Sequence, residues 1–334
     1  MQKIAVDAMG GDFAPESPLR GAVQSLQQSE DFVLVLYGNQ GVIEKHLASM
    51  DFDRGRVQIV HASESIGMGD SPVEALKRKK DSSIIKMVVA AAHGEVDAVI
   101  SAGNTGAFAA ACQLKLRTLP GVIRPGIGVV IPSFHGPFVL CDAGANIQAK
   151  AQHLHQYGIM AGLYAQKVVG IEEPRVALLS VGEESEKGTT LIKQTQGLLR
   201  EDDRVNFVGN VEGRQLFDGV CDVAVCDGFV GNLMLKFVEG VAEGFLKTIG
   251  AEVASEAPDS KVRQTLHDVL DRVRARHDYS EYGGAPLLGA GGVSIICHGR
   301  SNDRAIFNAI RVARKFLTLG LNDAIAERFG AASG

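Results

Sequence analysis

The chain has 334 residues, of which 46% are apolar and 22% charged, and its net charge is −5. These are values of an ordinary globular protein, and the negative charge argues against a general nucleic-acid-binding protein. No apolar run approaches the roughly 18 to 20 residues of a membrane span, and we expect no secretory signal in the first residues. Five cysteines without metal-ligand spacing indicate a reduced, cytoplasmic protein in which they are small buried hydrophobic residues.

Short runs of β-branched and other apolar residues alternate along the chain with longer amphipathic stretches. The expected strands cover residues 3–7, 32–36, 57–60, 97–100, 127–131, 138–141, 176–180, 205–208, 222–226 and 293–297. Helical patterns such as residues 18–29 and 153–169 lie between them. This alternation is typical of βαβ units and predicts an α/β fold, with a largely parallel sheet and helices on both faces.

The clearest change in composition starts near residue 251, where a polar turn leads into a helical pattern over residues 261–276. Its apolar residues share one face of the helix: Val262, Leu266, Val269, Leu270 and Val273. Such a stripe usually packs on its own core, and packing on a partner is the alternative. With the apolar stretch 229–249, it predicts a helical hairpin over residues 229–282 that projects from a single α/β domain spanning residues 1–334.

Glycine is enriched, at 39 of 334 residues, against an average near 7%. Many of the glycines lie in five segments that follow predicted strands: residues 8–12, 101–106, 142–146, 182–188 and 227–232. Ligands of open α/β sheets bind at the carboxyl ends of strands, where glycine lets the backbone approach them and helix N-termini favour anions. Tight turns alone would explain any one segment, but five segments, nearly all with Asn or Asp, favour a cleft for phosphate or another small anion.

Signatures of several other enzyme classes are missing from the sequence. The first βα turn lacks G-x-G-x-x-G, residues 182–188 lack the G-K-[ST] of a Walker loop, and neither G-x-S-x-G nor H-E-x-x-H occurs. We therefore expect neither a metal nor a cofactor.

Seven motifs occur in an order and spacing typical of one enzyme family: AVDAMGGD, SAGNTGA, DAGAN, GEESEKG, CDGFVGN, GGAPLLGAGG and HGRSN. From Ala5 to about Asn322, the chain closely resembles the bacterial phosphate:acyl-[acyl carrier protein] acyltransferases of phospholipid synthesis. The resemblance implies that a thioester of acyl carrier protein reacts with inorganic phosphate to give acyl phosphate and free carrier protein. A membrane acyltransferase would then pass the acyl group to glycerol 3-phosphate.

The resemblance also implies a fold similar to those of isopropylmalate and isocitrate dehydrogenases and phosphotransacetylases. It implies a cytoplasmic homodimer with peripheral membrane association. The family's catalytic lysine and asparagine correspond to Lys187 of GEESEKG and Asn232 of CDGFVGN.

Because phosphate is itself a nucleophile, the reaction needs proximity, charge compensation and donors for the tetrahedral oxyanion. We expect Lys187 and Asn232 to supply the donors, with Lys187 also offsetting the charge of phosphate. The candidates for phosphate contact are Asn104 and Thr105, then Asn146, together with Ser101. The carboxylates Asp7, Asp12, Asp142 and Asp227 are expected to support these donors, since a carboxylate beside phosphate is repulsive.

Acyl carrier proteins are small and acidic, so docking would need a basic patch on this acidic chain. One candidate is the run Lys77-Arg78-Lys79-Lys80, which could equally be a solvated helix face. We favour the cations that flank the apolar stripe of the hairpin: Lys261, Arg263, Arg272, Arg274 and Arg276. The polar hairpin tip argues against lipid insertion there, whereas the stripe could lie on a membrane or close a dimer.

Three rival functions fit parts of the same pattern. An enzyme like phosphotransacetylase, using acyl-CoA, would need the same phosphate-binding loops. A metal- and NAD-dependent hydroxyacid dehydrogenase would need an acidic metal cluster and a ribose-binding carboxylate, which the sequence does not reveal. A non-catalytic module that binds an anion or a carrier protein would show no phosphate-dependent thioester cleavage.

Overall fold

A computed structural model of the chain describes residues 1–256, 264–266, 268–270, 272–273 and 279–330. Its strands are β1 Gln2–Asp7, β2 Phe32–Gly38, β3 Val57–His61, β4 Ala98–Ser101, β5 Gly126–Ile131, β6 Phe138–Cys141, β7 Val176–Leu179, β8 Phe207–Val211, β9 Val223–Val225, β10 Ala285–Leu288 and β11 Val293–Ile296. Its helices are α1 Glu16–Gln27, α2 Gln40–Leu47, α3 Pro72–Arg78, α4 Ser83–Ala92, α5 Thr105–Lys115, α6 Ala151–Tyr164, α7 Thr190–Arg200, α8 Gly228–Glu256, α10 Asp303–Thr318 and α11 Leu321–Gly330. Short turns of other helix types cover Arg54–Arg56, Ala165–Val169, Gly213–Asp218 and Tyr279–Tyr282.

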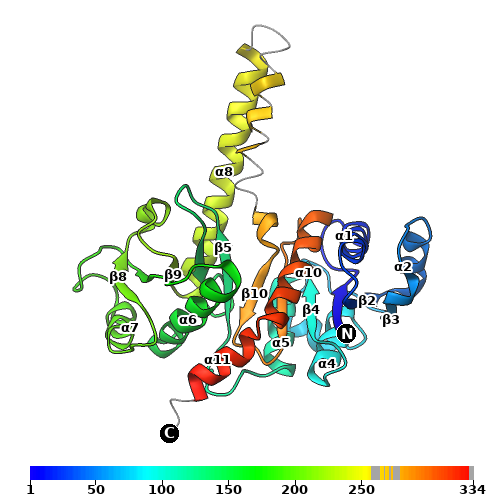
Figure 1. The fold of residues 1–334 in the computed structure, drawn as a ribbon, viewed down its shortest axis with the longest axis horizontal. Helices are drawn as coiled ribbons and strands as arrows, with labels where there is room; N and C mark the ends of the chain where they lie inside the picture. The colour runs from blue at the N-terminus through cyan, green and yellow to red at the C-terminus, as the bar shows by residue number, and fades with distance from the viewer. Residues whose placement is uncertain (257–263, 267, 271, 274–278, 331–334) are drawn as a thin grey trace.

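The strands form one continuous sheet in the order β3-β2-β1-β4-β11-β10-β5-β6-β9-β7-β8. The first five strands of this order, from β3 to β11, pair in parallel with one another. The last four, from β6 to β8, also pair in parallel. Between these two parallel blocks, β10 and β5 pair antiparallel with each other and with the strands beside them. The expected α/β fold with a largely parallel sheet is therefore confirmed, and the two blocks meet at one antiparallel junction (Figure 1).

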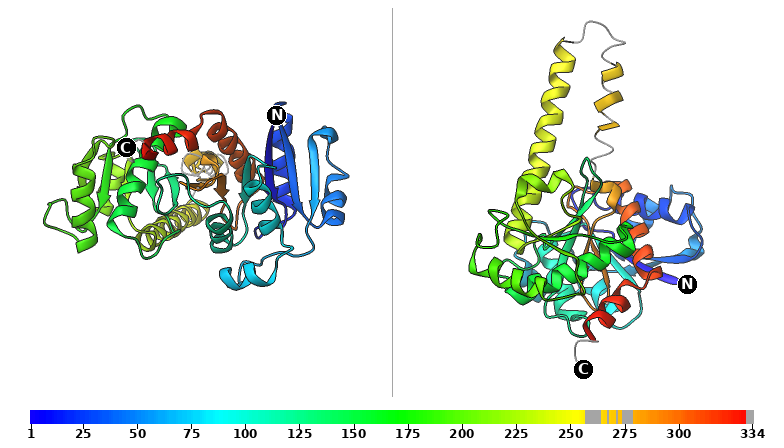
Figure 2. Two further views of the ribbon diagram at one scale, coloured as in Figure 1. Left: turned by 90° about the horizontal axis from the view of Figure 1, so that it is seen from below. Right: turned by 60° about the vertical axis from the view of Figure 1, so that its left-hand side comes forward.

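Helices cover both faces of the sheet, as the buried character of the strands requires (Figure 2). Side chains of α1, α2, α6, α7, α10 and α11 pack in one core on one face. Side chains of α3, α4 and α5 pack on the other face, in a second core. All five cysteines are buried, and burial raises the pKa of each thiol, so the prediction that they are packing residues is confirmed.

One strand of the structure was not predicted, and another begins later than expected. Strand β10 was missed because its four residues APLL are enclosed by the glycine-rich stretch 283–292, which reads as a loop. Strand β8 begins at Phe207 rather than Val205, because Asp202–Val205 form a turn in which the Val205 amide donates to the Asp202 carbonyl.

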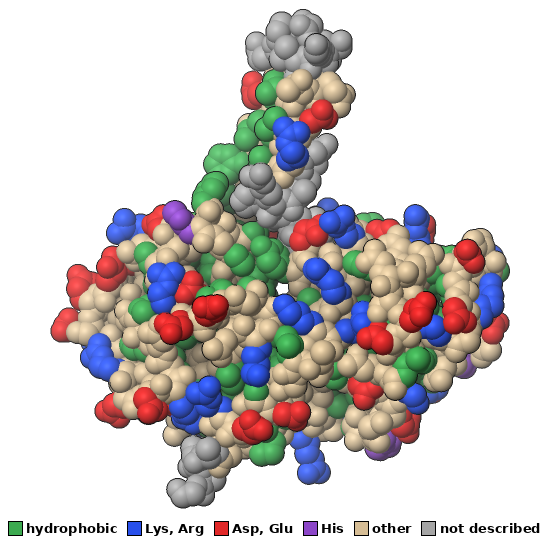
Figure 3. All heavy atoms as spheres, in the orientation of Figure 1, with side chains coloured by type: hydrophobic (Ala, Val, Ile, Leu, Met, Phe, Trp, Pro, Cys, Tyr) green, Lys and Arg blue, Asp and Glu red, His purple; other side chains and the backbone are tan. Residues whose placement is uncertain are grey.

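Helix α8 projects from the body of the protein, away from the sheet (Figures 1 and 2). Exposed apolar side chains recur along it at every fourth position: Phe229, Leu233, Phe237, Val241, Phe245 and Ile249. Figure 3 shows hydrophobic atoms gathered on this helix where it leaves the body. On the returning arm, Leu266, Val269 and Val273 are also exposed. The common expectation that such a stripe faces its own core therefore does not hold for these residues.

Candidate active site

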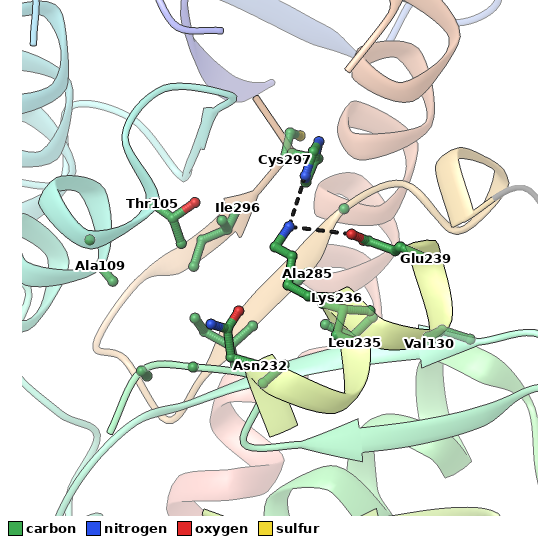
Figure 4. Close-up of a pocket in the computed structure, with 18 of the residues that line it drawn as sticks. Thr105, Ala109, Val130, Asn232, Leu235, Lys236, Glu239, Ala285, Ile296 and Cys297 are labelled. Atoms are coloured by element: carbon green, nitrogen blue, oxygen red, sulfur yellow. Dashed lines mark hydrogen bonds and ion pairs between the residues drawn. The ribbon is translucent and has the colours of Figure 1, made fainter. Parts of the chain in front are cut away.

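A cavity of about 390 Å³ opens where the two parallel blocks of the sheet meet. Its wall on the first block comes from one side of α5, from Thr105 to Gln113, and from the end of β11. Its wall on the second block comes from α8 and the loop after β6. The floor is formed by β5 and β10. Figure 4 shows Thr105 and Asn232 reaching toward this space from opposite walls. This is the position at which open α/β sheets bind ligands.

Asp142 fixes the loop on the second block. Its Oδ1 accepts hydrogen bonds from the backbone amides of Ile127, Gly144 and Ala145 at 2.9–3.0 Å, and its Oδ2 accepts one from Asn146 at 2.7 Å. Burial raises the pKa of Asp142, and these four hydrogen bonds oppose that shift. The carboxylate therefore shapes residues 143–146 from beneath the cavity, which suits the predicted supporting role.

Asp7 makes an equivalent arrangement on the first block. Its Oδ2 accepts a hydrogen bond from the Ser101 hydroxyl at 2.7 Å, and that hydroxyl accepts one from the Gly103 amide at 3.0 Å. A side chain at Gly10 would clash, since an added Cβ would lie 2.5 Å from Asp7 Oδ2. Burial raises the pKa of Asp7, while its hydrogen bonds to hydroxyls and an amide lower it. Ser101, predicted to touch phosphate, is thus engaged in holding the loop that precedes α5.

The two asparagines predicted to bind phosphate are also engaged by the protein itself. Asn104 donates its amide hydrogens to the carbonyls of Gly67, Met68 and Asp70, and its Oδ1 caps α5 at the Ala107 amide. Asn146 donates to the Pro125 carbonyl and the Tyr157 hydroxyl. Contact between either side-chain amide and phosphate would require breaking these hydrogen bonds, which costs free energy at the buried Asn104 and the half-buried Asn146.

Asp227 and Asp12 are not among the residues that line the cavity. Asp227 caps the start of α8, because its Oδ1 accepts from the amides of Phe229 and Val230 at 3.0 and 3.1 Å. Asp12 is exposed, and its backbone amide donates to the Gly299 carbonyl at 2.7 Å. Asp227 thereby orients the helix that carries Asn232.

Asn232 lies in the second turn of α8 and lines the cavity. Glycine at two positions brings that turn close to the sheet. A Cβ at Gly231 would lie 2.0 Å from the Asp142 carbonyl oxygen, and one at Gly144 would lie 3.4 Å from the Asn232 Cβ. The Asn232 side chain is thereby placed directly over the loop that Asp142 holds.

Three charged or titratable side chains that the sequence analysis did not select line the same cavity: Lys236, Glu239 and His298. The Lys236 Nζ donates to His298 Nε2 at 3.0 Å and lies 3.3 Å from Glu239 Oε2 (Figure 4). Burial lowers the pKa of His298, and the positive charges of Lys236 and Arg300 lower it further, while Glu239 raises it. A lowered pKa favours the neutral ring, which can accept the hydrogen bond from Lys236.

A signal for these residues was present in the sequence. Lys236 follows Asn232 by four residues, so the two share a helix face, and His298 begins the motif HGRSN. Motif positions alone did not indicate that the end of β11 meets this face of α8.

Lys187 is exposed in the loop after β7, where its backbone amide donates to the Glu184 carbonyl. Strand β7 pairs with β9, the strand that leads into α8, so the loops of Lys187 and Asn232 follow neighbouring strands. Among the described residues, Lys187 is not part of the cavity lining. Its catalytic role stays a prediction.

Of the hairpin cations, Arg272 is described and exposed, whereas Lys261, Arg263, Arg274 and Arg276 lie outside the described residues. In the other basic run, Lys79 is paired with Asp70 at 2.6 Å, while Lys77, Arg78 and Lys80 are exposed. In the described part of the chain, no group of three or more His, Cys, Asp or Glu side chains could hold a metal ion.

Solved structures define the class of fold. The chain superimposes on a phosphotransacetylase from Streptococcus pyogenes with a TM-score of 0.63 at 16% identity, covering 95% of this chain and 94% of that one. It superimposes on EutD phosphotransacetylase from Staphylococcus aureus with a TM-score of 0.57 at 14% identity, covering 94% of each. The fold is therefore that of the phosphotransacetylases.

Sequence comparison defines the family. A family model described as "Fatty acid synthesis protein" matches residues 2–324. Proteins named phosphate acyltransferase are similar over nearly their whole length: that of Halothermothrix orenii is 46% identical and covers 94% of both chains. That of Desulforamulus reducens is 46% identical and covers 98% of this chain and 97% of its own. The chain belongs to this phosphate acyltransferase family and is an acyltransferase.

Proposed function

We propose that the protein transfers the acyl group of a long-chain acyl-[acyl carrier protein] to inorganic phosphate, giving acyl phosphate and free carrier protein. The observation that carries the proposal is the cavity in which Asn232 and the Lys236 ammonium group face the start of α5. An amide donor, an ammonium group and a helix N-terminus together suit a phosphate and a developing oxyanion.

In the proposed reaction, a phosphate oxygen attacks the thioester carbonyl carbon and forms the new carbon–oxygen bond. The carbonyl oxygen becomes a tetrahedral oxyanion, which Asn232 stabilises with a hydrogen bond. Collapse of the intermediate breaks the carbon–sulfur bond, and the thiolate leaves and takes a proton from solvent. No nucleophile of the protein takes part, so catalysis rests on proximity and on charge.

Lys236, Thr105 and Lys187 are proposed to make separate contacts with the phosphate or the oxyanion. Lys236, held by His298 and Glu239, offsets the charge of the bound phosphate at the cavity. Thr105 donates its hydroxyl to a phosphate oxygen from the first turn of α5. Lys187 reaches the same phosphate or the oxyanion from the neighbouring loop when the thioester is bound.

The carrier protein is proposed to dock beside the hairpin, with Arg272 among the cations that attract its acidic surface. The exposed stripe of α8, from Phe229 to Ile249, is proposed to close a homodimer or rest on a membrane surface. Of the described helices, none combines the length and apolar character needed to cross a bilayer. The acyl phosphate would then pass to a membrane glycerol-3-phosphate acyltransferase.

The deciding experiment measures release of free thiol from palmitoyl-[acyl carrier protein] with and without phosphate, while hydroxylamine traps the acyl phosphate. We expect both products to appear only with phosphate. The same assay with palmitoyl-CoA tests the acyl-CoA alternative, which would be favoured if CoA were the better donor. Thiol release independent of phosphate, or none at all, would refute the proposed reaction.

A further inference from the structure

A second cavity, of about 490 Å³, adjoins the candidate active site. The two cavities share lining residues from β5, α8 and the end of β11: Val129, Val130, Leu235, Glu239 and His298. From these shared residues the second cavity extends as a groove between β5 and the inner face of α8, as far as Leu246 and Lys247. A molecule that reacts beside Asn232 can therefore continue into it.

Most of the residues that line this groove are apolar. On one side they come from the second half of β5 and from Phe217, and on the other from Leu235, Val238, Ala242 and Leu246 of α8. The four α8 residues are spaced by three or four positions and so share one face of the helix. The volume falls within the roughly 300–1,000 Å³ of small-molecule sites, which are mostly apolar.

Charged groups also line the groove, and they pair with one another. Glu243 lies 2.8 Å from Lys247 and 3.8 Å from Arg300, and Glu239 lies 3.3 Å from Lys236. A ligand without polar groups can lie against the apolar walls without disturbing these pairs. The amide groups of a polar ligand would lack hydrogen-bond partners against the apolar walls, and burying unpaired amides costs free energy.

We propose that this groove binds the hydrocarbon chain of the acyl donor, with the reacting carbonyl beside Asn232 and the chain directed along α8 toward Leu246. The inference rests on the proposed function, because it assigns a place to one part of that substrate. Each methylene removed from water in the groove tightens binding about fourfold. The enzyme should therefore favour long chains over short ones, and the pantetheine arm of the donor should enter from another side.

The test places bulk in the groove. Ala242→Phe adds a ring on the groove face of α8 without adding a polar group. The matched control is Gly244→Phe, because residue 244 lies on another side of the same helix and an added Cβ there meets no atom within 4 Å. Phosphate-dependent thiol release is measured with palmitoyl and butyryl thioesters of the same carrier protein. We expect Ala242→Phe to lower kcat/KM at least tenfold for palmitoyl and less than twofold for butyryl, and Gly244→Phe to affect both donors equally or neither.

Binding of cis-parinaric acid, a fluorescent long-chain fatty acid, tests the groove without catalysis. Ala242→Phe should weaken its binding at least tenfold and Gly244→Phe should not, whether or not the protein turns over thioesters. The proposal would be overturned if Ala242→Phe lowered kcat/KM equally for palmitoyl and butyryl donors. It would also be overturned if Phe237→Ser abolished fatty acid binding while Ala242→Phe left it unchanged. Unchanged fatty acid binding together with a changed oligomeric state of Ala242→Phe would overturn it too, because the groove would then be a subunit contact.

Discussion

The loops and the helix that meet at the candidate active site use their polar groups differently. In the loops after β4 and β6, the side chains of Asn104 and Asn146 are already hydrogen-bonded to carbonyl or hydroxyl groups of the protein. On α8, Asn232 and Lys236 line the cavity itself. The comparison teaches that a polar residue in a glycine-rich loop can hold the site in shape, while a residue on the adjoining helix faces the cavity.

The largest expected effect is on turnover, at the residues assigned to the oxyanion. Asn232→Ala should lower kcat on the order of 100- to 1,000-fold, the usual cost of losing one oxyanion donor. Lys187→Ala should lower kcat by a similar factor, since it removes a positive charge from the neighbouring loop. Phosphate-dependent thiol release gives both values, with Lys193→Ala on α7 as an exposed lysine control. Near-normal turnover in both variants would contradict the assignment.

A smaller effect is expected at Lys236. Lys236→Met should raise the KM for phosphate about tenfold or more, as expected for one charge-assisted hydrogen bond. The pKa of His298 is lowered by burial and by neighbouring positive charges. Removing Lys236 should therefore raise that pKa, which NMR titration of the ring measures. Lys167→Met, at an exposed lysine that lines neither cavity, should leave both values unchanged, and a fall in the pKa of His298 in Lys236→Met would refute the contact.

Two neighbouring residues at the start of α5, Asn104 and Thr105, are expected to have different roles: Asn104 stabilises the loop and Thr105 contacts phosphate. Asn104→Ala should lower the free energy of unfolding by about 1–3 kcal/mol, because it removes a helix cap and leaves buried carbonyls unpaired. Thr105→Val should leave that free energy nearly unchanged and reduce kcat/KM for phosphate about two- to tenfold, as for one neutral hydrogen bond. Urea denaturation measures the free energy of unfolding of both variants, and steady-state kinetics measure kcat/KM for phosphate. If Asn104 rather than Thr105 contacts phosphate, Asn104→Ala would show the larger loss of kcat/KM.

The smallest effect is expected on the surface of the hairpin. Arg272→Glu should weaken carrier protein binding a few-fold at low salt and less at high salt, since exposed charges are screened. The Kd is measured by fluorescence anisotropy of labelled carrier protein at two salt concentrations. Arg200→Glu, an equal change of charge at the end of α7, should have little effect. Equal losses in the two variants would indicate attraction by net charge alone.

The parts of the fold that could be predicted are those with a local signal. Most strands were placed because buried parallel strands are continuous apolar runs, as in β4 and β6. Strand β10 was not predicted because it carries little local signal and its pairing with β5 depends on residues far away in the chain. The position of Asn232 in the cavity agrees with its motif, whereas the contact between Lys236 and His298 joins residues 62 positions apart. The hydrogen bonds of Asn104 to residues 67–70 have the same long-range character.

The order in which the sheet is assembled has a consequence for synthesis on the ribosome. Strand β4 pairs with β1 on one side and with β11 on the other, and β5 pairs with β10. Until the C-terminal part of the chain has emerged, the nascent N-terminal block therefore carries an unpaired strand edge, the feature that invites aggregation. The same late strands line the cavity, because β10 forms part of its floor and the end of β11 part of one wall. A chain that stops before residue 285 would thus lose its solubility and its active site together.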